Sequence, residues 1–504
     1  MSSAERIAPS DASGEISPIV EGSKPKERSS SSHPELIQGG MGVGVSGWEL
    51  ARSVAIAGEK LGKRVLGTVS GVGLSAICAE KLGRGDEDTM RALQAFPVPE
   101  IAQELKGRYW LRKNRLFQSI LPPKPEVLIN GSKESKDLLT KLLVFSNYAE
   151  VFLAKQGHKG PISINYLEKV QPGRLFELYG AMLAGVDYVA MGAGLPHQTP
   201  GILDRFAAGQ SASYKIDVTG SEGEGYDMVF NPATIFGDHF LKRPNFLGIV
   251  SLLLAAKVIM KKTEGEICGF VVESPIAGGH NAPPRKRGED NGDIPVYGPK
   301  DMPDLDGFRN LGLPFWKAGG MASPVAFQNA ITEGAAGVQI GSAFALSDES
   351  GMREDHKREL ISRGFGETLI VTPSMKTSPT GFPFNVAQLS DSLSNPDIFN
   401  GRERECNYGF LREFYKTPEG KVRSRCPAED ISTFVKNGGK KEDAEIARCL
   451  CAGLGATVDM APGSYYIVTL GSKLDFLEKG RMINSPEGSY KAEDVTRFVF
   501  SNSE

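Results

Sequence analysis

The chain has 504 residues, of which 40% are hydrophobic and 24% charged, so it can form a large globular domain with a smaller additional unit. Its formal net charge of −3 argues against a protein that binds nucleic acid through phosphate contacts. The longest apolar stretch, residues 245–260, is too short to span a bilayer and contains Lys257, so we expect no membrane association.

Residues 1–33 are rich in serine, proline and charge, and we predict a disordered tail there. The N-terminus has no apolar signal core, and its acidic residues argue against a transit peptide. Only six cysteines occur in the whole chain, which does not suggest a disulfide scaffold. We therefore expect a cytoplasmic location.

From Pro34 onward, short β-rich runs alternate with helical patterns, which is typical of an α/β protein with parallel strands. We predict eight strands and hence a (β/α)8 TIM barrel over residues 34–345. The strands are expected at Leu36–Gln38, Arg64–Val69, Ile162–Tyr166, Tyr188–Met191, Phe246–Val250, Gly269–Glu273, Pro314–Lys317 and Gly337–Ile340.

Three stretches fall outside this repeat. Residues 85–145 and 211–240 are expected to be insertions in the barrel. The second insertion contains a β-like run, Ser213–Val218, which we interpret as part of a hairpin, although exchanging it for Phe246–Val250 would also give eight strands. Residues 346–504 are predicted to form a loop-rich, partly helical C-terminal extension that packs against the barrel.

A glycine-rich loop, Gln-Gly-Gly-Met-Gly-Val-Gly-Val-Ser at residues 38–46, follows the first strand. Its glycines would let the main chain lie flat against a planar ligand. A dinucleotide-binding fingerprint is disfavoured, because the second strand leads into Ser-Gly-Val-Gly and not into an acidic residue. A loop that only turns the chain is the other alternative.

Glycine pairs follow the last two predicted strands. Gly319 and Gly320 come after the seventh, and Gly341 with Ser342 comes after the eighth. Loops at these places in a TIM barrel often bind phosphate, because glycine allows close approach of main-chain N–H groups and a serine hydroxyl adds a donor. Each pair alone fits an ordinary turn, but two in succession favour a phosphate site.

The most specific motif is Glu-Ser-Pro-Ile-Ala-Gly-Gly-His-Asn-Ala-Pro-Pro-Arg at residues 273–285, after the sixth strand. This position would put His280 over the barrel mouth, where an imidazole can act as acid or base near neutral pH. Alternatively, His280 only orders its loop through hydrogen bonds. Arg285 either holds an anionic substrate or caps the loop at the surface.

Four cysteines lie in the C-terminal extension, and they could converge on a zinc or iron–sulfur site. They are Cys406, Cys426, Cys449 and Cys451. Their spacing is not the paired C-x-x-C of common metal sites, and C-x-C is a weaker signal. We therefore favour buried, reduced thiols and commit to no metal.

Together, these motifs resemble the nitronate monooxygenases, whose pattern is shared by FMN-dependent enoyl-acyl-carrier-protein reductases. The resemblance spans about residues 34–345. It rests on the first glycine loop, Ala-Gly-Gly-His at 277–280, Ala-Gly-Gly at 318–320 and Gly-Val-Gln-Ile-Gly-Ser-Ala-Phe at 337–344. The sequence after His280 departs from the Arg-Gly or Ile-Gly of the better-studied members.

The resemblance implies FMN as the cofactor and His280 as the catalytic histidine, which when protonated would stabilise negative charge on a nitronate or on reduced oxygen. It also implies that one group of residues lies along or near the flavin ring and that another holds the phosphate. The ring group is Gly39, Gly40, Met41, Asn165, Gly278 and Gly279, and the phosphate group is Gly319, Gly320, Gly341 and Ser342. We expect a monooxygenase that oxidises a nitronate or similar small carbon acid with dioxygen.

Two alternatives stay open. An NAD(P)H-dependent enoyl reductase of fatty-acid or polyketide synthesis would use His280 to polarise a thioester carbonyl, and it would dock an acyl carrier protein on basic residues such as 421–425. A non-catalytic flavin-binding or assembly protein would use the cysteine-containing extension to recruit a partner. The sequence allows a homo-oligomer but does not predict one.

Overall fold

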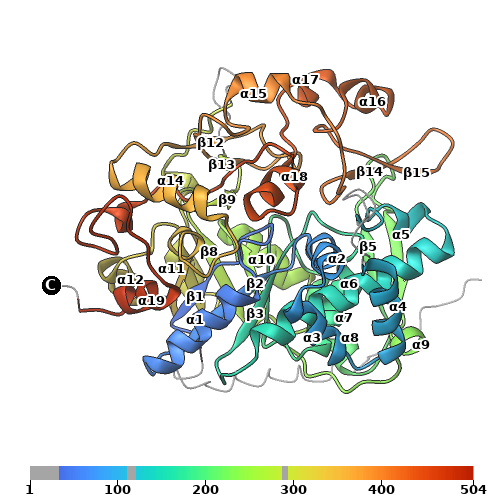
Figure 1. Ribbon diagram of the computed structural model, residues 1–504, viewed down its shortest axis with the longest axis horizontal. Coiled ribbons are helices and arrows are strands. Elements are labelled where there is room, and N and C mark those ends of the chain that lie inside the picture. The colour runs from blue at the N-terminus through green and yellow to red at the C-terminus, as the bar shows by residue number, and fades with distance from the viewer. Residues whose placement is uncertain (1–32, 111–120, 286–292, 462, 503–504) are drawn as a thin grey trace, which may run out of the picture. The chain divides into compact units, whose positions relative to one another are not determined.

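Eight parallel strands close into a barrel, as the alternating pattern predicted (Figure 1). They are β1 (Leu36–Gln38), β2 (Val65–Ser70), β3 (Ile162–Leu167), β4 (Tyr188–Gly192), β7 (Asn245–Val250), β8 (Gly269–Glu273), β10 (Phe315–Ala318) and β11 (Gly337–Ile340). They follow one another around the barrel in chain order, and β11 pairs with β1 to close it. The computed structural model describes residues 33–110, 121–285, 293–461 and 463–502, so the predicted tail lies outside the described residues except for His33.

Most residues of the barrel strands are apolar and buried, because both faces of the strands are covered. All six residues of β2 are buried, for example, and its glycine lets a helix pack closely. A Cβ added to Gly67 would lie 1.9 Å from the carbonyl oxygen of Ala51 in α1 (Trp48–Lys60). Only glycine therefore fits at this point of the barrel wall.

Helices follow the strands as expected. After β1 comes α1, and the later strands are followed by α2 (Leu74–Arg84), α7 (Arg174–Leu183), α8 (Thr199–Ala207), α10 (Leu253–Lys262), α11 (Leu305–Arg309), α12 (Pro324–Thr332) and α13 (Ser342–Ala345). The sequence determines where α12 starts. The Ser323 hydroxyl caps the helix by accepting a hydrogen bond from the Ala326 N–H at 3.2 Å, and Pro324 occupies the first turn.

The described residues of the stretch 85–145 are largely helical. It contains α3 (Glu87–Gln94), α4 (Pro99–Tyr109), α5 (Val127–Asn130) and the first half of α6 (Lys133–Ala154). Since α6 packs against α1, α2 and α7, it belongs to the ring of barrel helices, and the inserted part is α3 to α5. The second insertion is an antiparallel hairpin of β5 (Ala212–Ile216) and β6 (Tyr226–Phe230), followed by α9 (Ala233–Phe236), so the strand choice made from the sequence is correct.

The extension after residue 345 folds onto the barrel. It consists of α14 (Glu354–Phe365), β12 (Val371–Ser374), β13 (Phe384–Ala387), α15 (Pro396–Gly401), β14 (Glu413–Lys416), β15 (Val422–Arg425), α16 (Ile431–Lys436), α17 (Lys441–Ala444), α18 (Leu450–Gly455) and α19 (Ala492–Val499). Helix α19 packs against α1, α12 and α13, so the last helix of the chain completes the barrel wall (Figure 1). None of the helices in the described ranges combines the length and the apolar character of a membrane span.

Candidate active site

The carboxyl ends of all eight barrel strands open onto one cavity. From these ends it is lined by residues 39–43, Ser70, Val72, residues 165–167, Gly192, Ala193, Ile249, Glu273 and residues 318–322 and 339–343. Active sites of TIM-barrel enzymes lie at this end of the barrel, because the loops there come from every strand and can vary without disturbing the core. The cavity is therefore the candidate active site.

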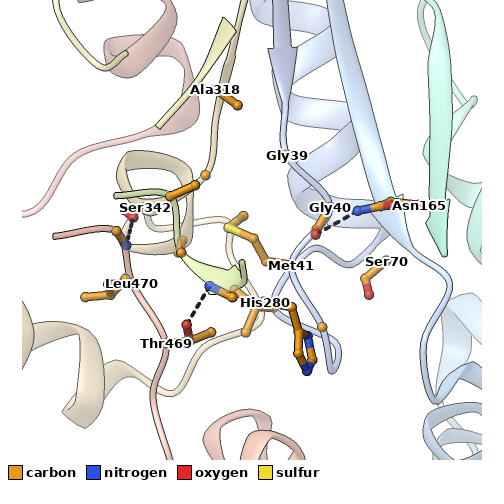
Figure 2. Close-up of a pocket in the computed structure, with 18 of the residues that line it drawn as sticks. Gly39, Gly40, Met41, Ser70, Asn165, His280, Ala318, Ser342, Thr469 and Leu470 are labelled. Atoms are coloured by element: carbon orange, nitrogen blue, oxygen red, sulfur yellow. Dashed lines mark hydrogen bonds between the residues drawn. The ribbon is translucent and has the colours of Figure 1, made fainter. Parts of the chain in front are cut away.

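Every residue predicted to bind the cofactor lines this cavity, and His280 does so too (Figure 2). The cofactor group comprises Gly39, Gly40, Met41, Asn165, Gly278, Gly279, Gly319, Gly320, Gly341 and Ser342. Arg285, in contrast, is exposed and absent from the cavity lining. Its backbone N–H donates to Asp301 at 2.8 Å, so the structure favours the surface-loop alternative for Arg285.

Two buried polar residues, Gln38 and Ser46, fix the first glycine loop by hydrogen bonds. The Gln38 side-chain amide donates to Ser46 Oγ at 2.9 Å, and Ser46 Oγ accepts from the Met41 N–H at 3.0 Å. Gln38 is itself fixed, because its Oε1 accepts from the Thr68 N–H at 2.7 Å. This hydrogen-bond network restricts the backbone conformation of the loop, which its glycines alone would leave flexible.

Asn165 joins this loop to the end of β3. Its Nδ2 donates to the carbonyl oxygen of Gly40 at 3.1 Å (Figure 2). A Cβ added to Gly40 would lie 2.3 Å from Asn165 Cβ, so glycine is required for this close approach. The other amide atom, Asn165 Oδ1, is buried and has no hydrogen-bond partner among the described residues. It is an acceptor available to a ligand in the cavity.

The loop after β8 returns across the barrel mouth as the short strand β9 (Gly279–His280). This strand pairs antiparallel with β13 of the extension, where His280 faces Phe384. His280 Nε2 lies 2.7 Å from Ser378 Oγ, and its ring meets the Phe384 ring edge-on at 4.8 Å. The imidazole is thus held between a hydroxyl and an aromatic ring, with part of its surface toward the cavity.

The environment of His280 favours the neutral imidazole. Burial lowers the pKa of His280 from 6.5 to about 4, because the positive form loses hydration in this setting. The protonated form expected from the sequence therefore needs a negative charge beside it. An anionic ligand in the cavity would supply that charge and raise the pKa of His280.

Glu273, at the end of β8, is a second titratable group in the cavity lining, and we did not single it out from the sequence as a site residue. Burial raises the pKa of Glu273 to about 7, because its negative form is poorly solvated there. It can therefore gain or lose a proton near neutral pH. Its position at the carboxyl end of a barrel strand was the available signal.

The two predicted phosphate loops lie next to each other in the lining, since β10 and β11 are neighbours. Gly319 and Gly320 have φ values of 97° and 68°, which favour glycine. Ser342 Oγ accepts a hydrogen bond from the Gly471 N–H at 2.8 Å, which leaves its own hydrogen available to a ligand (Figure 2). Lys473 lies beside this region, because a Cβ added to Gly320 would be 2.8 Å from Lys473 Cδ.

Residues of the extension line the same cavity, which the sequence did not reveal. They are Met352, Phe384, Phe410, Leu411, Leu450, Cys451, Leu454, Thr457, residues 467–471, Lys473 and Phe476. The segment around Thr469 is joined directly to the loop that carries His280, because the Gly279 N–H donates to Thr469 Oγ1 at 2.7 Å (Figure 2). The site therefore belongs to the barrel and the extension together.

The four cysteines of the extension meet at a different, small cavity. Within the described part of the chain, no set of three or more His, Cys, Asp or Glu side chains is arranged to hold a metal ion. The thiols are free, with Cys426 and Cys451 buried and Cys406 and Cys449 partly exposed.

Comparison with known proteins gives one match at the level of sequence families. Residues 242–379 match the family model described as nitronate monooxygenase. No curated protein matches the chain. The matched range runs from just before β7 to the loop that contains Ser378, so it includes His280 and both predicted phosphate loops.

Several solved structures align over most of the chain. The structure of FabK from Thermotoga maritima is 14% identical, with 92% of this chain and 91% of that chain covered and a TM-score of 0.43. A nitroalkane oxidase from Streptomyces ansochromogenes is also 14% identical, with 92% and 94% covered and a TM-score of 0.43. The enoyl reductase domain of MlnA, from the macrolactin biosynthesis cluster of Bacillus amyloliquefaciens, is 11% identical, with 92% and 93% covered and a TM-score of 0.44. Through residues 242–379, the chain resembles the nitronate monooxygenase family, as its motifs predicted.

Proposed function

We propose that the protein is an FMN-dependent oxidoreductase that oxidises a nitronate, or a similar small carbon acid, with dioxygen as the acceptor. The observation that supports this most directly is the convergence of His280 and the glycine-containing loops on one cavity at the carboxyl end of the barrel. The family match of residues 242–379 supports the choice of reaction.

The described residues fit a flavin mononucleotide. Asn165 Oδ1 is a buried acceptor without a protein partner, and a flavin ring carries an N–H group that would satisfy it. Gly279 has a φ of 81°, and a Cβ added there would meet no atom within 4 Å, so the glycine leaves open space beside the cavity. The glycine pairs after β10 and β11, with the Ser342 hydroxyl, are the donors that would hold the phosphate. When bound, the flavin accepts electrons from the substrate and passes them to dioxygen.

In this proposal, His280 is the residue that contacts the substrate. In the neutral form it can donate one hydrogen bond toward the cavity, and the charge of a nitronate would favour its protonation. Ser378 keeps the ring in place through the contact at Nε2. Glu273 can take up or release a proton near neutral pH, which suits a reaction at an acidic carbon.

The test is anaerobic reduction of the purified, FMN-loaded protein, followed by absorbance in the flavin bands. Addition of a nitronate should bleach the flavin, and admission of dioxygen should restore its colour. His280→Gln should bind FMN with unchanged affinity but be reduced at least about a hundredfold more slowly. Arg285→Gln, a change in the same loop outside the cavity, is the matched control and should behave as the unaltered protein.

Other results would replace the proposal. Bleaching by NADPH and not by a nitronate would indicate the enoyl-reductase alternative. Tight FMN binding without reduction by either compound would indicate a non-catalytic flavin protein. A protein that stays colourless after incubation with FMN would contradict the cofactor assignment itself.

A further inference from the structure

Four of the six cysteines come together in the extension, although they lie on three separate segments. Cys406, Cys426, Cys449 and Cys451 all line one small cavity. A buried ion pair stiffens its wall, because Arg412 Nη1 donates to Glu429 Oε2 at 2.6 Å. Arg412 also donates to Cys406 Sγ at 3.5 Å, and Glu429 Oε1 accepts from the Cys426 N–H at 3.1 Å. The thiols are therefore held in a defined arrangement.

Cys449 and Cys451 are the two that lie nearest each other in sequence. Only Leu450 separates them in sequence, at the point where α18 begins. A hydrogen bond from the Cys451 thiol lowers the pKa of Cys449, and the positive charge of Arg402 acts in the same direction. Cys449 is partly exposed, whereas Cys451 is buried. This is the arrangement of an accessible, reactive thiol with a second thiol behind it.

One member of the pair, Cys451, also lies in the wall of the candidate active site. Cys451 lines both the small cavity and the large one. The residue before Cys449 is tied to the loop that holds His280, because the Arg448 N–H donates to the Thr377 carbonyl oxygen at 3.0 Å and Arg448 Nη1 donates to Thr377 Oγ1 at 3.0 Å. Ser378, which follows Thr377 in the sequence, contacts His280.

We infer that Cys449 and Cys451 form a reversible dithiol–disulfide couple beside the active-site cavity, oxidised by a hydroperoxide. The Cys449 thiolate attacks one oxygen of the hydroperoxide, the O–O bond breaks, and the other oxygen leaves and takes up a proton as water or an alcohol. Cys449 is then a sulfenic acid. The Cys451 thiol attacks that sulfur, the S–S bond forms, and the sulfenic oxygen leaves as water.

The two steps balance. Two thiols lose two electrons and two protons, and the hydroperoxide is reduced to one molecule of water and one of water or alcohol. A dithiol reductant reverses the change by exchange through a mixed disulfide. The other two thiols of the cavity serve as internal comparisons, because they share its surroundings but are not paired within one short segment.

The test is mass spectrometry of the full-length protein, reduced and treated with chelator, before and after one equivalent of hydrogen peroxide. The intact mass should fall by two hydrogens, and peptide mapping should find one disulfide, between Cys449 and Cys451. Dithiothreitol should restore the original mass. In Cys451→Ser, a sulfenic acid should instead be trapped on Cys449 by dimedone, while Cys426→Ser, the matched control, should still form the disulfide.

Three results would overturn the inference. The first is that Cys449 and Cys451 stay reduced under peroxide, and the second is that the disulfide joins either of them to Cys406 or Cys426. The third is a stoichiometric zinc or iron in the protein as purified that is lost in Cys449→Ser, since this would make the thiols metal ligands. These measurements do not require flavin, so their outcome does not depend on whether the proposed function is correct.

Discussion

Acidification should destabilise the protein through His280. In the folded protein the pKa of His280 is about 4, against an ordinary value of 6.5, so between these values the unfolded chain takes up a proton that the folded protein does not. The contribution of His280 to stability is therefore intact above about pH 6.5 and is lost as the pH falls toward 4. At about pH 5 the linkage relation gives a loss of roughly 2 kcal/mol relative to pH 7.5. Part of the imidazole faces a cavity that water can fill, so this is an upper bound.

The assay is urea unfolding of the unaltered protein and of His280→Gln at both pH values, both without FMN. Glutamine retains a polar group for Ser378 but does not titrate. Buried carboxyls with raised pKa values, such as Glu273, act in the opposite direction but equally in both proteins. The unaltered protein should therefore lose up to about 2 kcal/mol more than the variant. Equal losses would show that His280 is solvated in the folded state and would refute the account of its neutral form.

Three further predictions concern the cavity wall and the hydroxyl that contacts His280. Gly40→Ala should weaken FMN binding at least tenfold by isothermal titration, since the new Cβ would lie 2.3 Å from Asn165 Cβ, whereas an alanine at a solvent-exposed glycine should not. Lys473→Ala should raise the Kd for FMN about fivefold but leave that for riboflavin unchanged, because only FMN has the phosphate; an equal loss for both would place Lys473 away from it. Ser378→Ala should lower kcat about tenfold without changing the Kd for FMN, since it removes the hydroxyl beside His280; a pure loss of FMN affinity would contradict that role.

The barrel and its rim could be predicted because their signals are local. Buried parallel strands are continuous apolar runs, and a loop that must bring main chain close to a ligand is rich in glycine. Both signals lie within a few residues of each other, as in β11 and the following Gly341 and Ser342. The exchange of Ser213–Val218 for Phe246–Val250 stayed open in the sequence. In the structure β5 alternates between buried and exposed residues and pairs antiparallel with β6, whereas β7 is buried along most of its length and belongs to the barrel.

The contacts made by the extension could not be predicted, because they join residues that are far apart in sequence. Thr469 meets Gly279 across 190 positions, and Gly471 meets Ser342 across 129. Neither segment of the extension carries a motif, since a hydroxyl or a backbone N–H in a loop suits almost any sequence. The same holds for the cysteines, whose irregular spacing reflects three segments that meet only after folding.

These contacts imply that the extension is needed to position the residues of the candidate active site. It supplies the hydroxyl beside His280, the acceptor for the Gly279 N–H and the donor to Ser342, and its last helix, α19, occupies the barrel wall against α1 and α12. A barrel that ended at residue 345 would expose the apolar faces of α1 and α12 and would leave β9 without its partner β13. His280 would then sit on an unsupported loop. The extension, although it carries no recognisable motif around Thr469 and Gly471, therefore determines whether His280 is held in place.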